Sequence, residues 1–273
     1  MRLIAKIIDD NTIEVYDLAQ FDMDAIMHSG QVFRYFDIEG GGYDLVVGDN
    51  FCVLKNDGDR VIIKCNDAKY FFEYFDLGRD YGVVKKIMDE NICFAPIIKD
   101  SGGIRILKGE FVEMVISFIV SANNNIKRFK KTLNLLAEEF GRRLANGRYS
   151  FPDLAGLQKV KESDFNRMGC GYRSPYLVKT IERLKDMDYF YLKTLSNEQL
   201  MMELMQLYGV GKKVASCIML FCFHRLDVAP VDTWINKAIE GLGEDKHFLI
   251  NHKYAGIYQQ YIFHYMQHLK KEI

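Results

Sequence analysis

The sequence predicts an α+β protein, in which an N-terminal antiparallel β-sheet is followed by an all-α bundle. Up to about residue 95, short runs of β-branched and aromatic residues alternate with clusters of Gly, Asn and Asp, as in strands joined by tight turns. From Ala68 onward, apolar residues recur at three- and four-residue spacing, the period of an amphipathic helix. Connections of two to four residues between the early runs favour antiparallel hairpins.

The strand-like segments come first along the chain. They are residues 2–9, 12–18, 32–40, 43–49, 51–56 and 60–66. Gly-Gly-Gly and Asn-Asp-Gly-Asp sequences separate some of them, and such sequences are typical of turns. We therefore expect these segments to pair in one twisted sheet.

The helix-like segments follow without a sequence repeat or a low-complexity linker. They are residues 68–77, 81–92, 110–122, 127–141, 174–187, 196–207, 212–223, 233–242 and 253–271. We expect a domain of residues 1–98, the sheet with flanking helices, and a helical domain of residues 99–273. Within the second, two helices joined by a glycine-containing hairpin (helix–hairpin–helix) are expected at about residues 199–222.

The charge of the chain is divided unevenly. The whole chain has 36 basic and 37 acidic side chains, which alone argues against a protein coated in basic charge. Residues 1–100 contain 11 basic and 19 acidic side chains, whereas residues 101–273 contain 25 and 18. An acidic part is thus joined to a basic part, and the basic part is the better candidate for a polyanionic partner.

Targeting and redox signals point to a soluble, intracellular protein. No segment reaches the ~18 apolar residues that a membrane span needs, and the N-terminus lacks the features of a signal peptide. The cysteines are Cys52, Cys65, Cys93, Cys170, Cys217 and Cys222. None stands at disulfide-motif or zinc spacing, so we expect buried free thiols.

The turn between the helices near residues 199–222 is the most informative segment. Gly209 and Gly211 let the backbone turn and leave amides at a helix N-terminus, an arrangement suited to a phosphate. Glycine is common in helix–helix turns, so this pattern alone leaves a purely structural turn open. Lys213 follows two residues into the next helix, and Asp232 stands where it can cap the helix after it. A lysine and a carboxylate brought together would form an activated amine nucleophile.

Five separated motifs together resemble the 8-oxoguanine DNA glycosylases, within the helix–hairpin–helix DNA glycosylase superfamily. They are Ser29–Arg34 (SGQVFR), Ser121–Ile126 (SANNNI), Gly171–Arg173 (GYR), Gly209–Cys217 with Ala229–Asp232 (GVGKKVASC and APVD), and Ala255–Phe263 (AGIYQQYIF). The resemblance runs along the whole chain. It implies that the helical domain is a helix–hairpin–helix glycosylase bundle and that the chain excises 8-oxoguanine from duplex DNA.

The resemblance also implies the catalytic residues. Lys213 resembles the family's amine nucleophile, which attacks deoxyribose C1′, forms a Schiff base and permits β-elimination as an AP lyase. The family spacing Gly-Val-Gly-x-Lys selects Lys213 and leaves Lys212 as a phosphate-facing or solvated charge. Asp232 resembles the catalytic aspartate, which stabilises developing positive charge; a helix cap alone would also account for it.

A base pocket follows from the same resemblance, because such an enzyme must extrude its target base. Cys217 and Phe263 match the residues on the two faces of the flipped purine, and Gln259 matches the one that binds its Watson–Crick edge. The carbonyl of Gly30 would accept from N7–H of the oxidised base. Without the family, Cys217 and Phe263 would be interpreted as core residues and Gly30 as a turn glycine.

The remaining contacts implied by the family concern the DNA. Asn123, Arg128, Tyr172 and Arg173 match the residues that fill the vacated space and contact the opposite base. Their Asn and Arg side chains supply donors that suit an opposite cytosine. Gly209, Gly211 and Lys212 would meet phosphates. The carbonyls of Met205, Leu207 and Val210 would hold a monovalent cation.

Three features differ from family patterns. Trp234 stands two residues after the aspartate, where eukaryotic members carry His, which speaks against a phosphate contact there. Tyr208 replaces the usual hairpin Pro, which should cost the turn some rigidity. No cysteine follows Cys222, so the iron–sulfur cluster of related branches is excluded and no cofactor is expected.

Two alternatives remain open from the sequence. An alkylpurine DNA glycosylase has a similar two-part build, but lacks the hairpin lysine. A non-catalytic helix–hairpin–helix DNA-binding protein needs the hairpin and has no use for a Lys/Asp pair or a base pocket. For the favoured 8-oxoguanine glycosylase we expect a monomer that binds double-stranded DNA and no membrane. If the source is bacterial, we expect it in the cytoplasm with the nucleoid.

Overall fold

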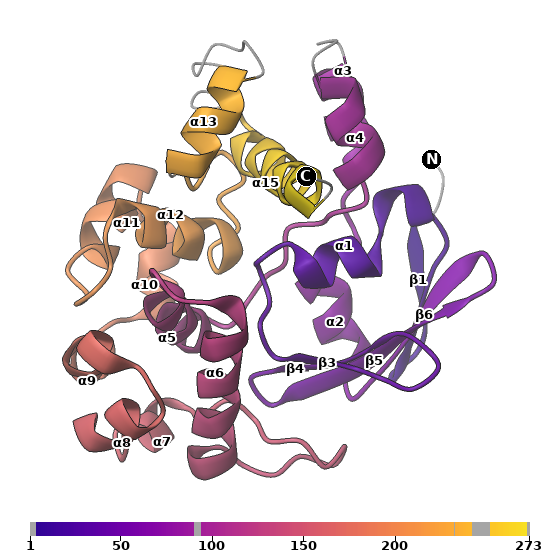
Figure 1. Cartoon of the computed structure of the whole chain (residues 1–273). Helices are drawn as coiled ribbons and strands as arrows, with labels where there is room; N and C mark the ends of the chain where they lie inside the picture. The colour runs from indigo at the N-terminus through magenta and orange to yellow at the C-terminus, as the bar shows by residue number, and fades with distance from the viewer. Residues whose placement is uncertain (1–3, 90–93, 232, 242–251, 272–273) are drawn as a thin grey trace. The chain divides into compact units, whose positions relative to one another are not determined.

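The computed structural model describes residues 4–89, 94–231, 233–241 and 252–271. Its elements confirm the predicted α+β class, with an N-terminal sheet followed by helices (Figure 1). The chain divides into two compact units, which are described separately. Unit 1 comprises residues 1–45, 52–108 and 224–273, and unit 2 comprises residues 46–51 and 109–223.

A six-stranded sheet in the order β1-β2-β6-β5-β4-β3 forms most of the N-terminal region. Its strands are β1 (Ala5–Asp9), β2 (Thr12–Val15), β3 (Tyr35–Asp37), β4 (Tyr43–Val47), β5 (Asn50–Asp57) and β6 (Arg60–Cys65). Each lies within or overlaps a segment that the sequence predicts to be a strand. The pairs β1/β2, β2/β6, β3/β4 and β5/β6 are antiparallel, as the short connections indicated.

The helices of unit 1 pack on the sheet and on one another. They are the 3-10 helix η1 (Leu18–Gln20), α1 (Met23–His28), α2 (Ala68–Tyr74), α3 (Tyr81–Asp89), α4 (Ala95–Ser101), α13 (Thr233–Gly241) and α15 (Ala255–Lys271). Helix α2 contacts β1, β2 and β6, while α15 contacts both α4 and α13. The sequence did not indicate α1 and α4, because six and seven residues are too few to display a period.

Unit 2 is helical. Its helices are α5 (Phe111–Ser121), α6 (Ile126–Phe140), α7 (Leu154–Leu157), α8 (Glu162–Arg167), the 3-10 helix η3 (Gly171–Arg173), α9 (Ser174–Leu184), α10 (Tyr189–Thr194), α11 (Asn197–Leu204) and α12 (Lys212–Phe221). Helix α5 contacts α6, α9 and α12, and its residues 113–120 are all buried. Helix α5 therefore provides the core against which α6, α9 and α12 pack.

The two units divide the chain differently from the domains expected at residues 98 and 99. The segment His224–Ile273 groups with the sheet in unit 1, although it follows the helical segments in sequence. The expected domains remain a prediction about independent folding, which compactness alone does not test. Among the described residues, no helix is both long and apolar enough to cross a bilayer.

Candidate functional site

Gly30 lies against the ring of Phe263 within unit 1. Gly30 follows helix α1 and has φ +79°, a conformation that side chains rarely adopt. A Cβ built on it would lie 3.4 Å from Cε1 of Phe263 on α15. The structure therefore brings together two predicted pocket residues that are more than two hundred positions apart in sequence.

The loop that carries Gly30 is held by its neighbour Gln31, which is buried. Gln31 Nε2 donates to Ser29 Oγ and to the carbonyl of Arg105, each at 2.9 Å. Its Oε1 accepts from the amide of Leu107 at 2.9 Å. The Gln of the SGQVFR motif thus positions the glycine carbonyl, a role that its sequence alone did not reveal.

Gln259 lies one turn before Phe263 on α15, and its side chain is buried. Its Oε1 accepts a hydrogen bond from Gln260 Nε2 at 2.9 Å. This bond leaves the amide nitrogen of Gln259 available as a donor and orients the group. Gly30, Gln259 and Phe263 form the part of the predicted base pocket that unit 1 supplies.

The hairpin between α11 and α12 belongs to unit 2. Gly209 has φ +81°, and a Cβ there would lie 3.3 Å from Cδ2 of Tyr176 and 3.4 Å from Ile119. Thr180 Oγ1 donates to the carbonyl of Tyr208 at 2.8 Å, which ties the turn to α9. A side chain at position 209 would therefore push the hairpin away from the helices that support it.

Gly211 is the N-cap of α12 and provides no side chain to cap the helix. A Cβ at this residue would meet nothing within 4 Å, so its surface is open. The first amides of an α-helix have no partner within the helix, and α12 begins with the exposed side chains of Lys212 and Lys213. Backbone amides and cationic side chains at one helix end are suited to bind a phosphate group.

Lys213 and Cys217 are one turn apart on α12, but they differ in exposure. Lys213 is exposed, whereas Cys217 is only 4% exposed. An amine at the surface can meet a substrate atom, and a buried thiol beneath it can line a cavity wall. Both residues belong to unit 2, whereas Gly30, Gln259 and Phe263 of the predicted pocket belong to unit 1.

Two further predictions fall on residues whose placement is not given. Asp232 lies outside the described residues, and so does the side chain of Trp234. Helix α13 begins at Thr233, directly after Asp232 in sequence. The pairing of Asp232 with Lys213 therefore stays a prediction.

The buried side chain of Arg173 hydrogen-bonds to the asparagine loop that follows α5. Asn123 is exposed and has φ +49°, a left-handed conformation that Asn tolerates better than most residues. Arg173 is 6% exposed. Its guanidinium donates to the carbonyl of Ala122 at 2.8 Å and to that of Asn123 at 2.7 Å. In this structure the hydrogen bonds of Arg173 stabilise the turn at Asn123. A contact between Arg173 and an opposite base stays a prediction.

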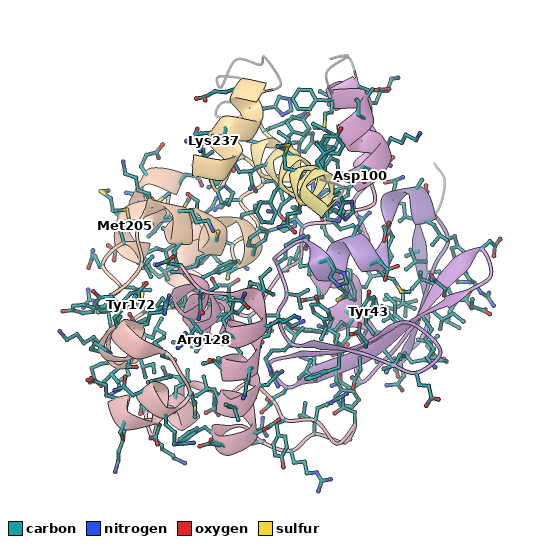
Figure 2. The ribbon with its side chains drawn as sticks, viewed as in Figure 1. Tyr43, Asp100, Arg128, Tyr172, Met205 and Lys237 are labelled. Atoms are coloured by element: carbon teal, nitrogen blue, oxygen red, sulfur yellow. The ribbon has the colours of Figure 1, made fainter. Side chains whose placement is uncertain are left out.

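Tyr172 and Arg128, which Figure 2 labels, also belong to unit 2. Tyr172 is 58% exposed, and the guanidinium of Arg173 lies 4.3 Å from its ring centroid. Arg128 is exposed and donates from Nη2 to the carbonyl of Gly169 at 3.1 Å. Arg173 thus contacts both Asn123 and Tyr172. We refer to Asn123, Arg128, Tyr172 and Arg173, all in unit 2, as the Asn123 group; its first three members are exposed.

The carbonyls expected to bind a cation belong to the turn before α12. The carbonyl of Leu207 accepts from the amide of Val210 at 3.1 Å, so the turn is closed by its own backbone. A carbonyl oxygen has a second lone pair, which leaves Leu207 able to bind an ion with Met205 and Val210. That cation stays a prediction.

Comparisons with known proteins agree with the motifs. A family model described as "8-oxoguanine DNA glycosylase, N-terminal domain" matches residues 15–115. An "N-glycosylase/DNA lyase" of Saccharomyces cerevisiae is 34% identical over 204 residues, 68% of this chain and 53% of the relative. The "N-glycosylase/DNA lyase OGG1" of Arabidopsis thaliana is 31% identical over 52% of this chain and 41% of that protein. The matches thus span about half the length of these curated relatives.

A solved structure matches almost end to end. It is the 8-oxoguanine glycosylase/lyase of Clostridium acetobutylicum, in complex with double-stranded DNA containing cytosine opposite 8-oxoguanine. It is 32% identical, with a TM-score of 0.87, and the match covers 96% of this chain and 97% of that one. Sequence identity at this level over the full fold, with the ordered motifs, shows common descent. The chain belongs to the 8-oxoguanine DNA glycosylase family.

Proposed function

We propose that the chain is a bifunctional DNA glycosylase and AP lyase that excises 8-oxoguanine from duplex DNA. The observation that carries this proposal is the position of Lys213, an exposed amine at the second residue of α12, two positions after the Gly-Val-Gly hairpin. A helix–hairpin–helix protein that only binds DNA needs the hairpin amides, but it needs no amine nucleophile at this position. An alkylpurine glycosylase of the same build would lack this lysine.

The proposed reaction begins when the neutral amine of Lys213 attacks deoxyribose C1′ with its lone pair. The bond between C1′ and N9 breaks, and the base leaves with the bonding electrons and takes up a proton. Opening of the sugar ring then yields the iminium, or Schiff base. Loss of a C2′ proton expels the 3′ phosphate by β-elimination. Asp232 would stabilise the positive charge that develops on the sugar.

Recognition of the flipped base is assigned to Gly30, Gln259, Phe263 and Cys217. The contact between the Gly30 loop and the Phe263 ring supports a stacking surface next to the carbonyl that accepts N7–H. Guanine lacks this proton and would leave the carbonyl unpaired, which costs about 1–3 kcal/mol. One such hydrogen bond cannot supply all the discrimination, so steps before insertion of the base must share it.

Recognition of the opposite base is assigned to the group around Asn123. Asn and Arg side chains offer donors to O2 and N3 of cytosine, and the exposed ring of Tyr172 has the size of a wedge between bases. The guanidinium of Arg173 already donates to the carbonyls of Ala122 and Asn123, so a contact with cytosine requires these bonds to be exchanged or shared. The side chain of Arg128 donates to the carbonyl of Gly169, which leaves it more donors for the opposite base.

The remaining proposals concern the surroundings of the reaction. The chain would act as a monomer on double-stranded DNA, with Gly209, Gly211 and Lys212 at the phosphates and without an iron–sulfur cluster or other redox cofactor. A monovalent cation on the carbonyls of the hairpin would bridge the turn to a phosphate. In a bacterium, the chain would work in the cytoplasm, on the nucleoid.

Borohydride trapping on a duplex with 8-oxoguanine opposite cytosine tests the proposal. We expect a covalent protein–DNA adduct with the native chain, because borohydride reduces the Schiff base to a stable amine. Lys213→Gln should abolish the adduct. The matched control, Lys212→Gln, removes the neighbouring ammonium and should weaken binding while it retains the adduct.

Two results would contradict the proposal. An adduct that persists in Lys213→Gln would place the nucleophile elsewhere. A native chain that leaves 8-oxoguanine intact but releases methylated purines would be an alkylpurine glycosylase instead.

A further inference from the structure

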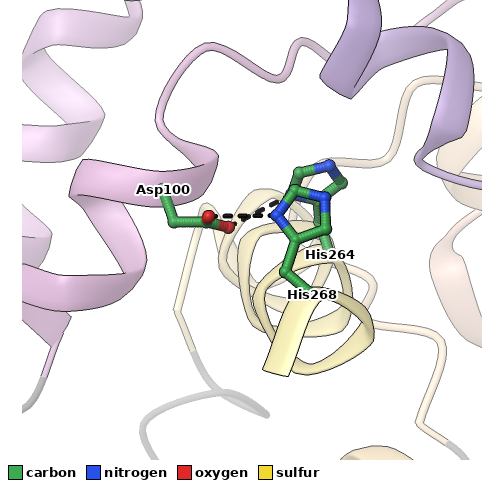
Figure 3. Close-up of side chains that lie close together, drawn as sticks. All are labelled: Asp100, His264 and His268. Atoms are coloured by element: carbon green, nitrogen blue, oxygen red, sulfur yellow. Dashed lines mark hydrogen bonds and ion pairs between the residues drawn. The ribbon is translucent and has the colours of Figure 1, made fainter. Parts of the chain in front are cut away.

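Two histidines and an aspartate meet where α15 packs on α4 in unit 1 (Figure 3). His264 and His268 are four residues apart on α15, so their side chains lie on one face of the helix. Asp100 comes from the last turn of α4. None of these residues belongs to the motifs on which the proposed function depends.

The carboxylate of Asp100 lies close to the Nδ1 atom of each histidine. His268 Nδ1 is 3.0 Å from Oδ1, and His264 Nδ1 is 3.4 Å from Oδ2. One ligand atom from each of the three residues can be chosen so that all lie within 4.8 Å of one another. A tetrahedral zinc ion with bonds of about 2.0–2.2 Å holds its ligand atoms about 3.3 Å apart. The carboxylate-to-imidazole separations already match that spacing.

The cluster is enclosed on one side and open on the other. The side chain of His264 is 3% exposed, whereas those of Asp100 and His268 are 29% and 41% exposed. An ion can therefore enter past His268, and water can occupy a fourth position. Ser101 Oγ, which is buried, donates to Asp100 Oδ2 at 2.8 Å and lies 3.0 Å from His264 Nδ1. This bond orients the carboxylate toward the two rings, as partners of metal ligands commonly do.

The donor set selects the class of ion. Two imidazoles and one carboxylate suit zinc and neighbouring transition metals, while magnesium and calcium prefer oxygen ligands alone. Coordination needs the lone pair of each Nδ1. Each neutral imidazole therefore carries its proton on Nε2 when the ion is bound. Without an ion, a proton on Nδ1 would let His268 donate to Asp100 Oδ1 and His264 donate to Ser101 Oγ.

We propose that Asp100, His264 and His268 form a binding site for one divalent transition-metal ion, with zinc as the natural probe, and that the ion clamps α15 to α4. Phe263 directly precedes His264, and Gln259 lies on the same helix. The clamp thus fixes the helix that carries both predicted pocket residues. Without an ion, the hydrogen bonds of Asp100 hold the same two helices together.

Cobalt and zinc titrations of the untagged, chelator-treated full chain test the site. We expect one equivalent of Co²⁺ to give the visible absorption of a four-coordinate ion with nitrogen and oxygen ligands, and Zn²⁺ to displace it. Zinc should raise the Tm of the native chain, because it binds the folded state. Binding does not depend on excision, so failure here leaves the proposed function intact, and the reverse also holds.

Variants assign the ligands. His268→Gln and Asp100→Asn keep hydrogen-bonding groups at partly exposed positions, so we expect folded proteins whose zinc affinity falls by about 100-fold or more, beyond the effect of losing a partner of a ligand. His28→Gln, at an exposed histidine of α1, is the control and should bind zinc as the native chain does.

Three results would overturn the proposal. The first is a native chain that binds no stoichiometric ion, in which case the cluster is a hydrogen-bonded clamp only. The second is unchanged affinity in both ligand variants. The third is a thiolate-to-cobalt charge-transfer band, which would assign the ion to a cysteine.

Discussion

Gly30 carries two constraints at a single residue, a left-handed backbone and a close approach to an aromatic ring. Its φ of +79° disfavours any side chain. A Cβ built on it would already be in van der Waals contact with the Phe263 ring, at 3.4 Å from Cε1, which leaves no spare room for a larger side chain. Gly40 offers a comparison, since its φ is +80° and a Cβ there would meet nothing within 4 Å. Substitutions at these two glycines can therefore be compared to distinguish the effect of backbone strain from the effect of filling the predicted pocket.

We predict that Gly30→Ala and Gly40→Ala each lower the free energy of unfolding by about 1–2 kcal/mol, the cost of a left-handed alanine. Only Gly30→Ala should slow excision of 8-oxoguanine, by about tenfold or more, because its methyl group displaces the base from the Phe263 face. Urea denaturation and single-turnover kinetics measure the two effects. Equal excision rates in both variants would remove Gly30 from the pocket.

At the scale of elements, Arg105 joins segments that have no sequence relation to one another. Its side chain is fully buried, and burial lowers the pKa of its guanidinium, while the neighbouring Tyr81 opposes that shift. The guanidinium donates to carbonyls at the end of η1 and in the segment between α2 and α3. These are the carbonyls of Gln20 at 3.0 Å, Phe75 at 2.9 Å, Arg79 at 2.7 Å and Asp76. The Asp76 carbonyl also accepts from the Arg79 amide. Arg105 thus pairs with backbone carbonyls that follow two helices.

We predict that Arg105→Met destabilises the chain by about 3–5 kcal/mol, because methionine fills the space but leaves several buried carbonyls unpaired. Arg142→Met is the matched control. Arg142 pairs with Asp49 at the surface, where both side chains are more than half exposed, so its loss should cost under about 1 kcal/mol. Denaturant melts compare the two. A loss of stability at position 105 no larger than at position 142 would contradict this role.

At the scale of the whole molecule, the charge asymmetry seen along the sequence persists in the folded units. Residues of unit 2 include 17 basic and 13 acidic side chains, while those of unit 1 include 19 and 24. The hairpin, Lys213 and the Asn123 group all belong to the basic unit. Binding of the DNA backbone is therefore compatible with a net charge near zero, and it should weaken as salt increases.

Global stability should depend on pH through His224 at the start of the C-terminal segment, whose side chain is 13% exposed. Burial lowers the pKa of His224 from 6.5 to about 4, against the opposing charge of Asp76. Its Nε2 lies 3.4 Å from the carbonyl of Ile106, which suits a neutral ring. Below pH 6.5 the unfolded chain therefore binds a proton that the folded chain does not, and stability falls as the pH drops toward about 4.

We predict that His224→Asn loses this part of the pH dependence, at most about 2–3 kcal/mol across that window. Asn suits the substitution because residue 224 has φ +55°, which Asn tolerates. Urea denaturation of both proteins at several pH values gives the slopes. Parallel slopes in the native chain and the variant would show that another group titrates.

Much of the fold follows from local patterns. Each strand of the sheet overlaps a segment with strand composition, and the long helices follow the three- and four-residue period, because periodicity directly encodes which face of an element is buried. The hairpin is also predictable from the sequence, since Gly209 and Gly211 lie between two amphipathic segments. Short helices such as α1 and α4 were missed, because their ends are set by caps and tertiary contacts rather than by a period.

The class of fold, the hairpin with its lysine, and membership of a family follow from the sequence, because ordered motifs at long intervals are specific. Three pairings come from the folded chain alone: Gly30 meets Phe263, the buried Arg173 holds the Asn123 loop, and Asp100 joins two histidines of α15. These pairings depend on which distant carbonyl, ring or carboxylate packing brings into reach. A side chain's type states what it can bind, whereas its partner is chosen by the fold.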